Sequence, residues 1–214
     1  MPTIVAEHVS KKIKHTDVLT DITYTFNEHY TYGLSGRNGS GKTMLIRALC
    51  GLIYINSGTI KVDGKVLHQD LSFPPSIGVI IEKTDLLSEY SAFTNLKILS
   101  KIKGITSDQE IKEAIDRVGL DPESKMPVRK FSLGMKQRLS IAQAIFEKPD
   151  ILLLDEPTNA IDKKGVESVR NILLEEKKRG ALIIIASHNQ EDLTILADTI
   201  LTMEGGRLVG NDQK

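Results

Sequence analysis

The sequence contains no long hydrophobic run and no excess of charge of either sign, and each absence excludes a class of protein. Its longest apolar runs, such as residues 151–154 and 181–186, are far too short to span a bilayer, and residues 1–3 do not begin a secretory leader. The 28 Lys and Arg residues equal the 28 Asp and Glu residues, so the chain has no overall basic field that would attract nucleic acid. We therefore expect a soluble, cytoplasmic chain with no nucleic-acid partner.

Cysteine is also scarce: Cys50 is the single one, so no disulfide framework is possible. It lies beside Leu49 in a helix-like segment, where a packed small hydrophobic residue is expected rather than a reactive thiol. The 214 residues, 40% of them hydrophobic, fit one globular domain with an ordinary core. We find no internal repeat and no low-complexity tract.

The most informative motif is a phosphate loop of the form Gly-x-x-x-x-Gly-Lys-Thr at residues 36–43, between a strand-like run at 30–34 and a helix-like run at 44–52. Its glycines let successive backbone N–H groups point inward around the β- and γ-phosphates, and the helix that follows adds the positive end of its dipole. Lys42 supplies an ammonium group, and the Thr43 hydroxyl can bind Mg2+. The sequence therefore predicts a nucleoside triphosphate site made by Gly36, Arg37, Asn38, Gly39, Ser40, Gly41, Lys42, Thr43 and Met44.

The pattern of hydrophobic residues predicts an α/β fold of one domain. Short strands are expected in the first third, at residues 3–9, 18–26, 30–34 and 58–62. Residues 83–148 are predicted to be helical, with a capping box formed by Ser107 and Glu110. Strands and helices then alternate again to the end of the chain, and their Ile- and Leu-rich strands indicate a parallel sheet covered on both faces. We therefore assign residues 1–82 and 149–214 to a nucleotide-binding core and residues 83–148 to a helical subdomain.

Chemically active side chains follow two of the predicted buried strands. Asp155 and Glu156 come at the end of the strand at 151–154, and His188 follows the strand at 181–186. Since the carboxyl ends of parallel strands meet at one edge of a sheet, these groups should lie near the phosphate loop. Asp155 could then reach Mg2+, Glu156 could polarise an attacking water, and the imidazole could hydrogen-bond the γ-phosphate.

A further segment, Phe-Ser-Leu-Gly-Met-Lys-Gln-Arg at residues 131–138, precedes a predicted helix. With the phosphate loop before it, and Asp155, residues 156–162 and His188 after it, the chain resembles the nucleotide-binding subunit of an ATP-binding cassette (ABC) transporter. The segment is similar to a divergent Leu-Ser-Gly-Gly-Gln signature that keeps Ser132 and Gly134. The resemblance covers residues 3–210 and implies a P-loop NTPase (RecA-like) core with a mainly parallel sheet, an N-terminal antiparallel β subdomain and an inserted α-helical subdomain.

The sequence departs from the family pattern at two positions. Glu82 stands where the family usually places a glutamine that reaches Mg2+, and this variant resembles the ABC exporters that protect bacteria from bacitracin or lantibiotic-type peptides. Ile13 falls near the aromatic residue that usually stacks on adenine. Without a ring, base stacking should be weaker and the preference for ATP over GTP less secure, unless Tyr24 or His15 substitutes.

The resemblance also implies a mechanism, in which two such subunits, identical or different, close on two ATP molecules with Mg2+. Ser132 and Gly134 of each subunit would contact the γ-phosphate held by the other. The expected catalytic residues are Glu156, His188 and Lys42, and the expected metal ligands are Thr43, Asp155 and Glu82. An integral-membrane permease would contact residues 82–95, which include Tyr90 and Phe93, unless these aromatic rings simply pack in the core. The chain would then lie peripherally on the inner face of the cell membrane.

Other interpretations remain open. A soluble cassette ATPase acting on DNA or ribosomes would usually carry a long coiled-coil insertion or a second cassette, and neither is present. A P-loop kinase or nucleotide switch would have no need for the segment at 131–138. A pseudo-enzyme that only binds nucleotide would not need Lys42, Asp155, Glu156 and His188 together.

Overall fold

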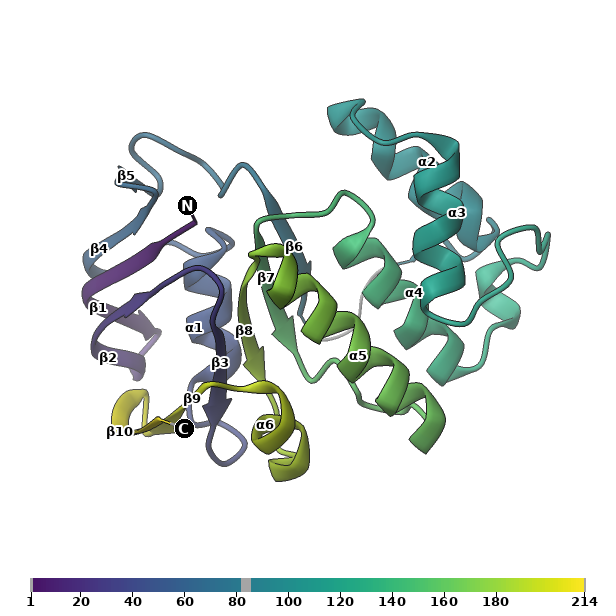
Figure 1. Cartoon of the computed structure of the whole chain (residues 1–214). Helices are drawn as coiled ribbons and strands as arrows, with labels where there is room; N and C mark the ends of the chain where they lie inside the picture. The colour runs from purple at the N-terminus through teal and green to yellow at the C-terminus, as the bar shows by residue number, and fades with distance from the viewer. Residues whose placement is uncertain (1, 82–85, 214) are drawn as a thin grey trace.

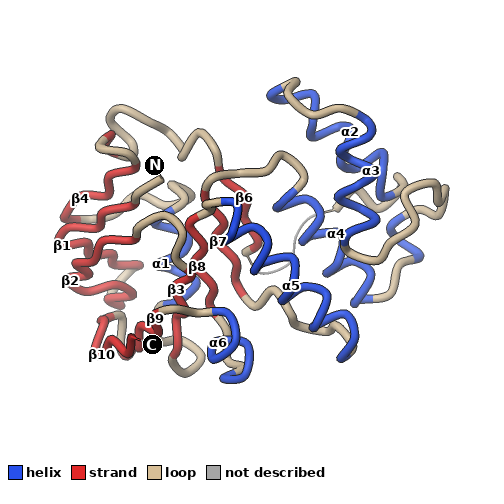
Figure 2. Tube along the Cα trace, viewed as in Figure 1, coloured by secondary structure: helices blue, strands red, loops and turns tan. Residues whose placement is uncertain are grey.

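The structure is a computed structural model that describes residues 2–81 and 86–213. Two β-sheets stand side by side with one helix between them, and the remaining helices lie beyond the second sheet (Figure 1). Colouring by secondary structure separates a strand-rich part from a helical part formed by the middle of the chain (Figure 2). This arrangement confirms the predicted α/β class.

The first sheet is antiparallel and has the order β2-β1-β4-β5. Its strands are β1 (Ile4–Ile13), β2 (Thr16–Phe26), β4 (Ser57–Val62) and β5 (Lys65–Val66). The sequence pattern predicted an end for β1 at Val9, but the strand continues because its outer half pairs with β2 as far as Ile13 opposite Thr16. Register shifts after Ala6 and Val9 interrupt the alternation of side chains, which explains why this half was missed.

The second sheet has the order β10-β9-β3-β8-β7-β6 and carries the predicted parallel strands. Its members are β3 (Thr31–Ser35), β6 (Ile77–Ile80), β7 (Ile151–Asp155), β8 (Leu182–Ala186), β9 (Thr199–Glu204) and β10 (Arg207–Gln213). Neighbouring strands from β6 to β9 are parallel, and β10 adds an antiparallel edge. All five residues of β7 and of β8 are buried, as expected for a sheet covered on both faces.

Helix α1 (Lys42–Leu49) lies between the two sheets (Figure 1). Its apolar side chains, such as Leu45 and Leu49, share one buried cluster with Ile4 of the antiparallel sheet and with Leu153 and Ile184 of the parallel sheet. Cys50, which directly follows the helix, belongs to the same cluster, and burial raises the pKa of its thiol to about 11. The expected packing role of this cysteine is therefore what the structure shows.

The other face of the parallel sheet is covered by α5 (Lys163–Arg179) and by the helical block. This block contains α2 (Ala92–Lys103), α3 (Asp108–Arg117), a 3-10 turn at Val128–Lys130 and α4 (Leu133–Ile145). The capping box of Ser107 and Glu110 begins α3 as predicted. The buried side chains of the block continue into the same cluster as Leu154 and Ile185 of the sheet, so the block and the core share one hydrophobic interior.

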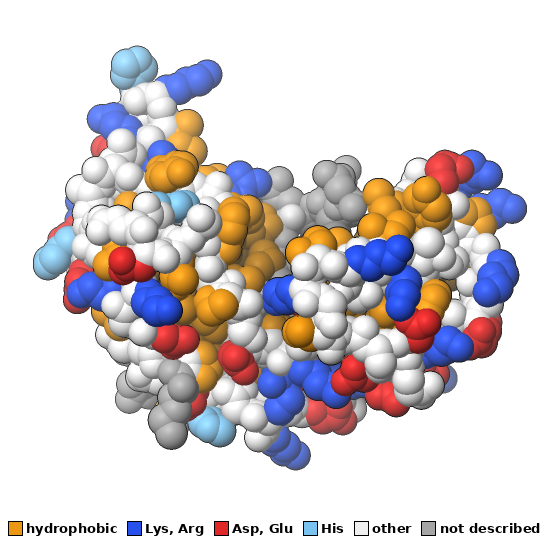
Figure 3. All heavy atoms as spheres, turned by 90° about the horizontal axis from the view of Figure 1, so that it is seen from above, with side chains coloured by type: hydrophobic (Ala, Val, Ile, Leu, Met, Phe, Trp, Pro, Cys, Tyr) orange, Lys and Arg blue, Asp and Glu red, His pale blue; other side chains and the backbone are white. Residues whose placement is uncertain are grey.

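The parallel strands run in one direction, so the carboxyl ends of β3, β7 and β8 lie together at the lower side of Figure 1. Seen from above, the opposite side is hollowed between the strand-rich and helical parts, and hydrophobic side chains gather around the hollow (Figure 3). Within residues 2–81 and 86–213, no helix is both long enough and apolar enough to cross a membrane.

Candidate nucleotide site

The phosphate loop connects β3 to α1 and has the backbone geometry that an anion-binding loop requires. Gly36, Gly39 and Gly41 have φ angles of 147°, 80° and 108°, which side chains disfavour. A Cβ on residue 36 would also stand 2.4 Å from the carbonyl oxygen of Met203. The glycines are therefore needed both for the turn and for its close approach to β9.

A cavity of about 1370 Å³ opens beside this loop. Most of the predicted phosphate-binding residues line it, namely Asn38, Gly39, Ser40, Gly41, Lys42, Thr43 and Met44. Gly36 and Arg37 line a smaller adjoining cavity of about 310 Å³. Asp155, Glu156 and the first turns of α4 line the same cavity. The structure therefore brings the phosphate loop and the end of β7 together at one site.

Two polar side chains of the loop are poised for a ligand. Ser40 is 7% exposed, and its hydroxyl is the one buried side-chain polar atom without a hydrogen-bond partner among the described residues. Lys42 donates through Nζ to the carbonyl oxygens of Gly36 at 2.6 Å and Arg37 at 3.2 Å, so its ammonium group folds over the loop. A bound phosphate would supply Ser40 with the missing partner and Lys42 with a negative charge.

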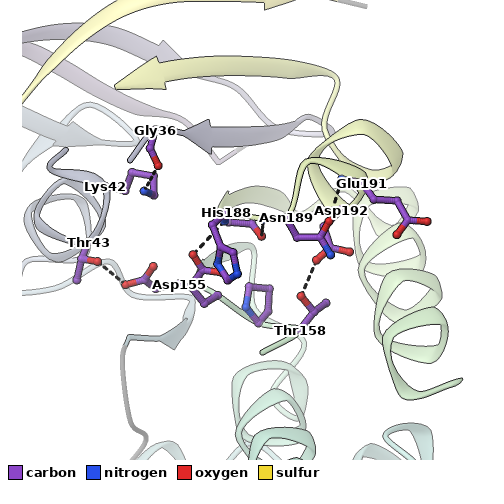
Figure 4. A network of polar contacts seen from close by, with 12 residues as sticks. Gly36, Lys42, Thr43, Asp155, Thr158, His188, Asn189, Glu191 and Asp192 are labelled. Carbon is purple, nitrogen blue, oxygen red and sulfur yellow. Dashed lines mark hydrogen bonds and ion pairs between the residues drawn. The ribbon is translucent and has the colours of Figure 1, made fainter. Parts of the chain in front are cut away.

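Thr43 and Asp155 provide the oxygen atoms that Mg2+ prefers. The Thr43 hydroxyl donates to Asp155 Oδ2 at 2.6 Å, across 112 residues of sequence (Figure 4). Within the described residues, no group of three or more His, Cys, Asp or Glu side chains could hold a metal ion by itself. The pair fits Mg2+ bound together with phosphate oxygens, which is the usual arrangement for this ion. Glu82, the third predicted ligand, lies outside the described residues.

Glu156 and His188 are in direct contact. The backbone N–H of His188 donates to Glu156 Oε1 at 3.0 Å, and Nδ1 lies 2.7 Å from Oε2. Glu156 has a φ of 51°, a conformation that costs a residue with a side chain about 1–3 kcal/mol. Such strain is typical of functional sites. The sequence placed both groups near the phosphate loop, but it did not predict that they bind each other.

Ser132 and Gly134 stand apart from this cluster and do not line the cavity, although Leu133 between them does. Ser132 is exposed and begins α4, where its hydroxyl accepts a hydrogen bond from the Met135 N–H at 3.2 Å. A Cβ on residue 134 would lie 2.9 Å from the carbonyl oxygen of Ala160, so the close packing at this position also favours a glycine. Neither residue lines the cavity beside the phosphate loop of its own subunit.

The wall next to the loop on the side of the first sheet consists of Thr16, Asp17 and Val18. Ile13 is 41% exposed and does not line the cavity. Tyr24 does not replace the missing ring, because it packs in a cluster with Phe26 and Tyr32, at centroid distances of 4.9 and 5.8 Å. His15 is likewise outside the cavity lining, so no aromatic ring of the described residues lines it.

The structure also reveals supporting residues that sequence reasoning missed. Gln137, on α4, donates to the carbonyl oxygens of Glu156 and Pro157 at 3.3 and 3.0 Å. Thr158, Arg170 and Asp192 form a buried polar network next to it. A buried charge cannot be recognised from sequence spacing alone, because burial depends on which elements pack together.

Together the loop, the strand-end acids and the parallel sheet define a P-loop nucleotide-binding protein. Comparison with known proteins narrows this class. A model of the ABC transporter family matches residues 19–159, so the chain belongs to the ABC transporter family. The match includes the phosphate loop, the segment at 131–138 and the strand-end acids, and it confirms the predicted family, fold class and ATPase activity.

Individual relatives agree with this assignment. An uncharacterized ABC transporter ATP-binding protein, YybJ of Bacillus subtilis strain 168, is 63% identical over 94% of this chain and 92% of its own. The bacitracin transport ATP-binding protein BcrA of Enterococcus faecalis is 35% identical over 96% of this chain and 68% of its own. A solved ATP-binding cassette, in a dimeric post-hydrolysis state with ADP and Pi, has a TM-score of 0.89 at 19% identity, over 98% of each chain.

Proposed function

We propose that this chain binds and hydrolyses ATP with Mg2+ as one of two cassette subunits, and thereby powers export through a membrane permease. The observation that carries the proposal is the arrangement around the cavity, where Thr43 of the phosphate loop pairs with Asp155 and Glu156 lines the same cavity. Lys42 and Ser40 would hold the phosphates, and Asp155 and Thr43 would hold Mg2+. When bound, this ion would neutralise the charge that develops on the phosphate oxygens.

Glu156 would act as the general base. Its carboxylate would accept a proton from the water whose oxygen attacks the γ-phosphorus, while the bond to the oxygen of the leaving ADP breaks. His188 supports this role because its backbone N–H and its ring both bind the Glu156 carboxylate. Their contact fixes the direction in which the carboxylate points, and the exposed ring edge remains available for the γ-phosphate.

A second subunit would complete the site. Ser132 is exposed at the amino end of α4 and lies outside the cavity of its own chain, so its phosphate-binding partner would be the loop of another cassette. The solved relative with ADP and Pi is itself dimeric. ATP would then bind the closed pair more tightly than the separated subunits, and this difference would drive the conformational cycle.

The permease would bind on the opposite side of the sheet. Exposed hydrophobic side chains occur at Phe73, in the segment between β5 and β6 along the upper side of Figure 1, and at Tyr90, before α2. In the β5–β6 segment, His68 also stacks on the exposed ring of Tyr54 with a centroid distance of 4.1 Å. Phe93 packs against the core instead, so of the two aromatic rings Tyr90 is the one available for contact.

A role in transport is supported by the similarity to BcrA, whose name describes bacitracin transport. Through the permease, the chain would lie peripherally on the inner face of the membrane. Affinity purification from detergent-solubilised membranes tests this assignment. Recovery of a small polytopic membrane protein is expected, whereas ribosomes or DNA in its place would contradict the proposal.

Hydrolysis is tested by Glu156→Gln, which keeps the shape of the side chain but removes the base. Loss of a general base should lower kcat by about 100-fold or more, with the Kd for ATP unchanged. The control is Glu167→Gln, at an exposed position of α5, which should keep full turnover. Undiminished hydrolysis by the Glu156 variant would refute the assigned role.

A further inference from the structure

A buried polar network lies beside the Glu156–His188 contact and connects the two loops that carry these residues. Asp192, in the first turn of α6 (Gln190–Leu196), is 1% exposed and accepts from the Thr158 hydroxyl at 2.5 Å. Its other oxygen accepts from Arg170 through Nε at 2.8 Å and Nη2 at 2.5 Å. Thr158 and Arg170 are themselves 9% and 8% exposed.

The network closes a ring of contacts. Thr158 follows Glu156 by two residues, and Asp192 follows His188 by four, so each loop contributes one member to the Glu156–His188 pair and one to the Thr158–Asp192 pair. Figure 4 shows the contact between Thr158 and Asp192, and it shows His188, Asn189, Glu191 and Asp192 in chain order from the end of β8 into α6. The position of one pair therefore constrains the other.

Neither loop is held in place by its own local structure, so each needs a contact that fixes its position. Glu156 holds a left-handed backbone conformation, which persists only when surrounding contacts enforce it. The His188 loop leads into a helix of seven residues, too short to fix its own position. Arg170 comes from the long helix α5 and supplies a rigid anchor for the Asp192 carboxylate.

We propose that Asp192, oriented by Arg170, is a positioning residue for ATP hydrolysis. By binding the Thr158 hydroxyl, it fixes the Glu156 loop against the His188 loop and sets the direction of the Glu156 carboxylate. It touches neither nucleotide nor attacking water, so it should affect the rate of the chemical step and leave nucleotide binding unchanged. The inference rests on the proposed function, because it assigns this network to the same reaction.

The test is Thr158→Val, which preserves the size of the side chain and the Asp192–Arg170 pair but removes the linking hydroxyl. The kcat should fall by about tenfold, because a small misplacement of reacting groups can cost up to about 100-fold. The Kd for ATP should be unchanged. Thr158→Ser, which retains the hydroxyl, should restore most of the lost turnover, and Arg170→Lys should give an intermediate loss.

Thr59→Val is the control, because Thr59 lies in β4, where valine is well accepted, and it should leave turnover unchanged. Melting curves and ATP binding establish that each variant is folded. The inference would be overturned if the kcat of Thr158→Val lay within about twofold of the wild-type value, or if Thr158→Ser lost as much turnover as Thr158→Val. Either result would leave the proposed function standing. A wild-type chain without any ATP turnover would overturn the proposed function and this inference with it.

Discussion

His188 and Glu156 meet through two hydrogen bonds, one from the backbone and one involving the ring, although 32 residues separate them in sequence. Each follows a central strand of the parallel sheet, β7 for Glu156 and β8 for His188, and these strands are direct neighbours. The contact therefore depends on the pairing of β7 with β8. Any change that shifts these strands relative to each other should weaken the active site as well as the fold.

The first prediction concerns the tight packing of α4 on the sheet. A Cβ on residue 78, in β6, would stand 1.9 Å from the carbonyl oxygen of Ala144, a backbone atom that cannot rotate away. Gly78→Ala should therefore lower the free energy of unfolding by about 3 kcal/mol or more. Urea denaturation measures the loss. Gly210→Ala, where the nearest atom would be 3.7 Å away, is the control and should change stability by less than about 1 kcal/mol.

The second prediction concerns dimerisation. Ser132→Arg, made in the Glu156→Gln background, places a bulky side chain at the exposed start of α4 and should block association of two subunits while leaving ATP binding intact. Sedimentation with saturating ATP and Mg2+ should show a dimer before the change and a monomer after it. Gln109→Arg, at an exposed position in the first turn of α3, should still dimerise. A dimeric Ser132 variant would argue against the assigned interface.

The third prediction concerns recognition of the base. None of the described aromatic rings lines the cavity, and a ring contact contributes about 0.5–1.5 kcal/mol. Without that contribution, the dissociation constants for ATP and GTP should agree within about tenfold. Thr16→Tyr adds a ring to the cavity wall and should tighten both nucleotides. His15→Tyr, one residue outside the lining, should have no effect. Calorimetry with the Glu156→Gln variant provides the measurement, and a hundredfold preference for ATP would contradict the interpretation.

The fourth prediction concerns acid stability. The backbone N–H of Ser107, together with Lys148 and the Ser107 hydroxyl, lowers the pKa of Glu110 to about 2 from its ordinary value near 4.5. A carboxyl with a lowered pKa in the folded state stabilises the fold fully above the unfolded value. This contribution is lost as the pH falls from about 4.5 towards 2.

Glu110→Gln removes that contribution at every pH. The difference in free energy of unfolding between wild type and variant should therefore be larger at pH 6 than at pH 3. Thermal or urea denaturation across this range gives the difference, and a value that does not change with pH would show that Glu110 has no such role in the folded state.

Much of the fold could be predicted because its signals are local. The buried strands β7 and β8 are runs of Ile and Leu, and the capping box of α3 lies within four residues, so periodicity and spacing located them. The predictions failed where local rules were interrupted or absent. Strand β1 was cut short because its bulges break the alternation of side chains, and β10 was missed because it forms as an edge strand against β9.

The sequence by itself determined the phosphate loop, the two acids after β7 and the membership of the ABC transporter family, because each depends on residues that are adjacent or in fixed order. Only the tertiary structure decided that Glu156 binds His188, that Asp192 binds both Thr158 and Arg170, and that Tyr24 packs against Phe26 instead of lining the nucleotide cavity. These contacts depend on strand order and helix packing, which bring distant residues within hydrogen-bond distance, and no spacing along the chain specifies them.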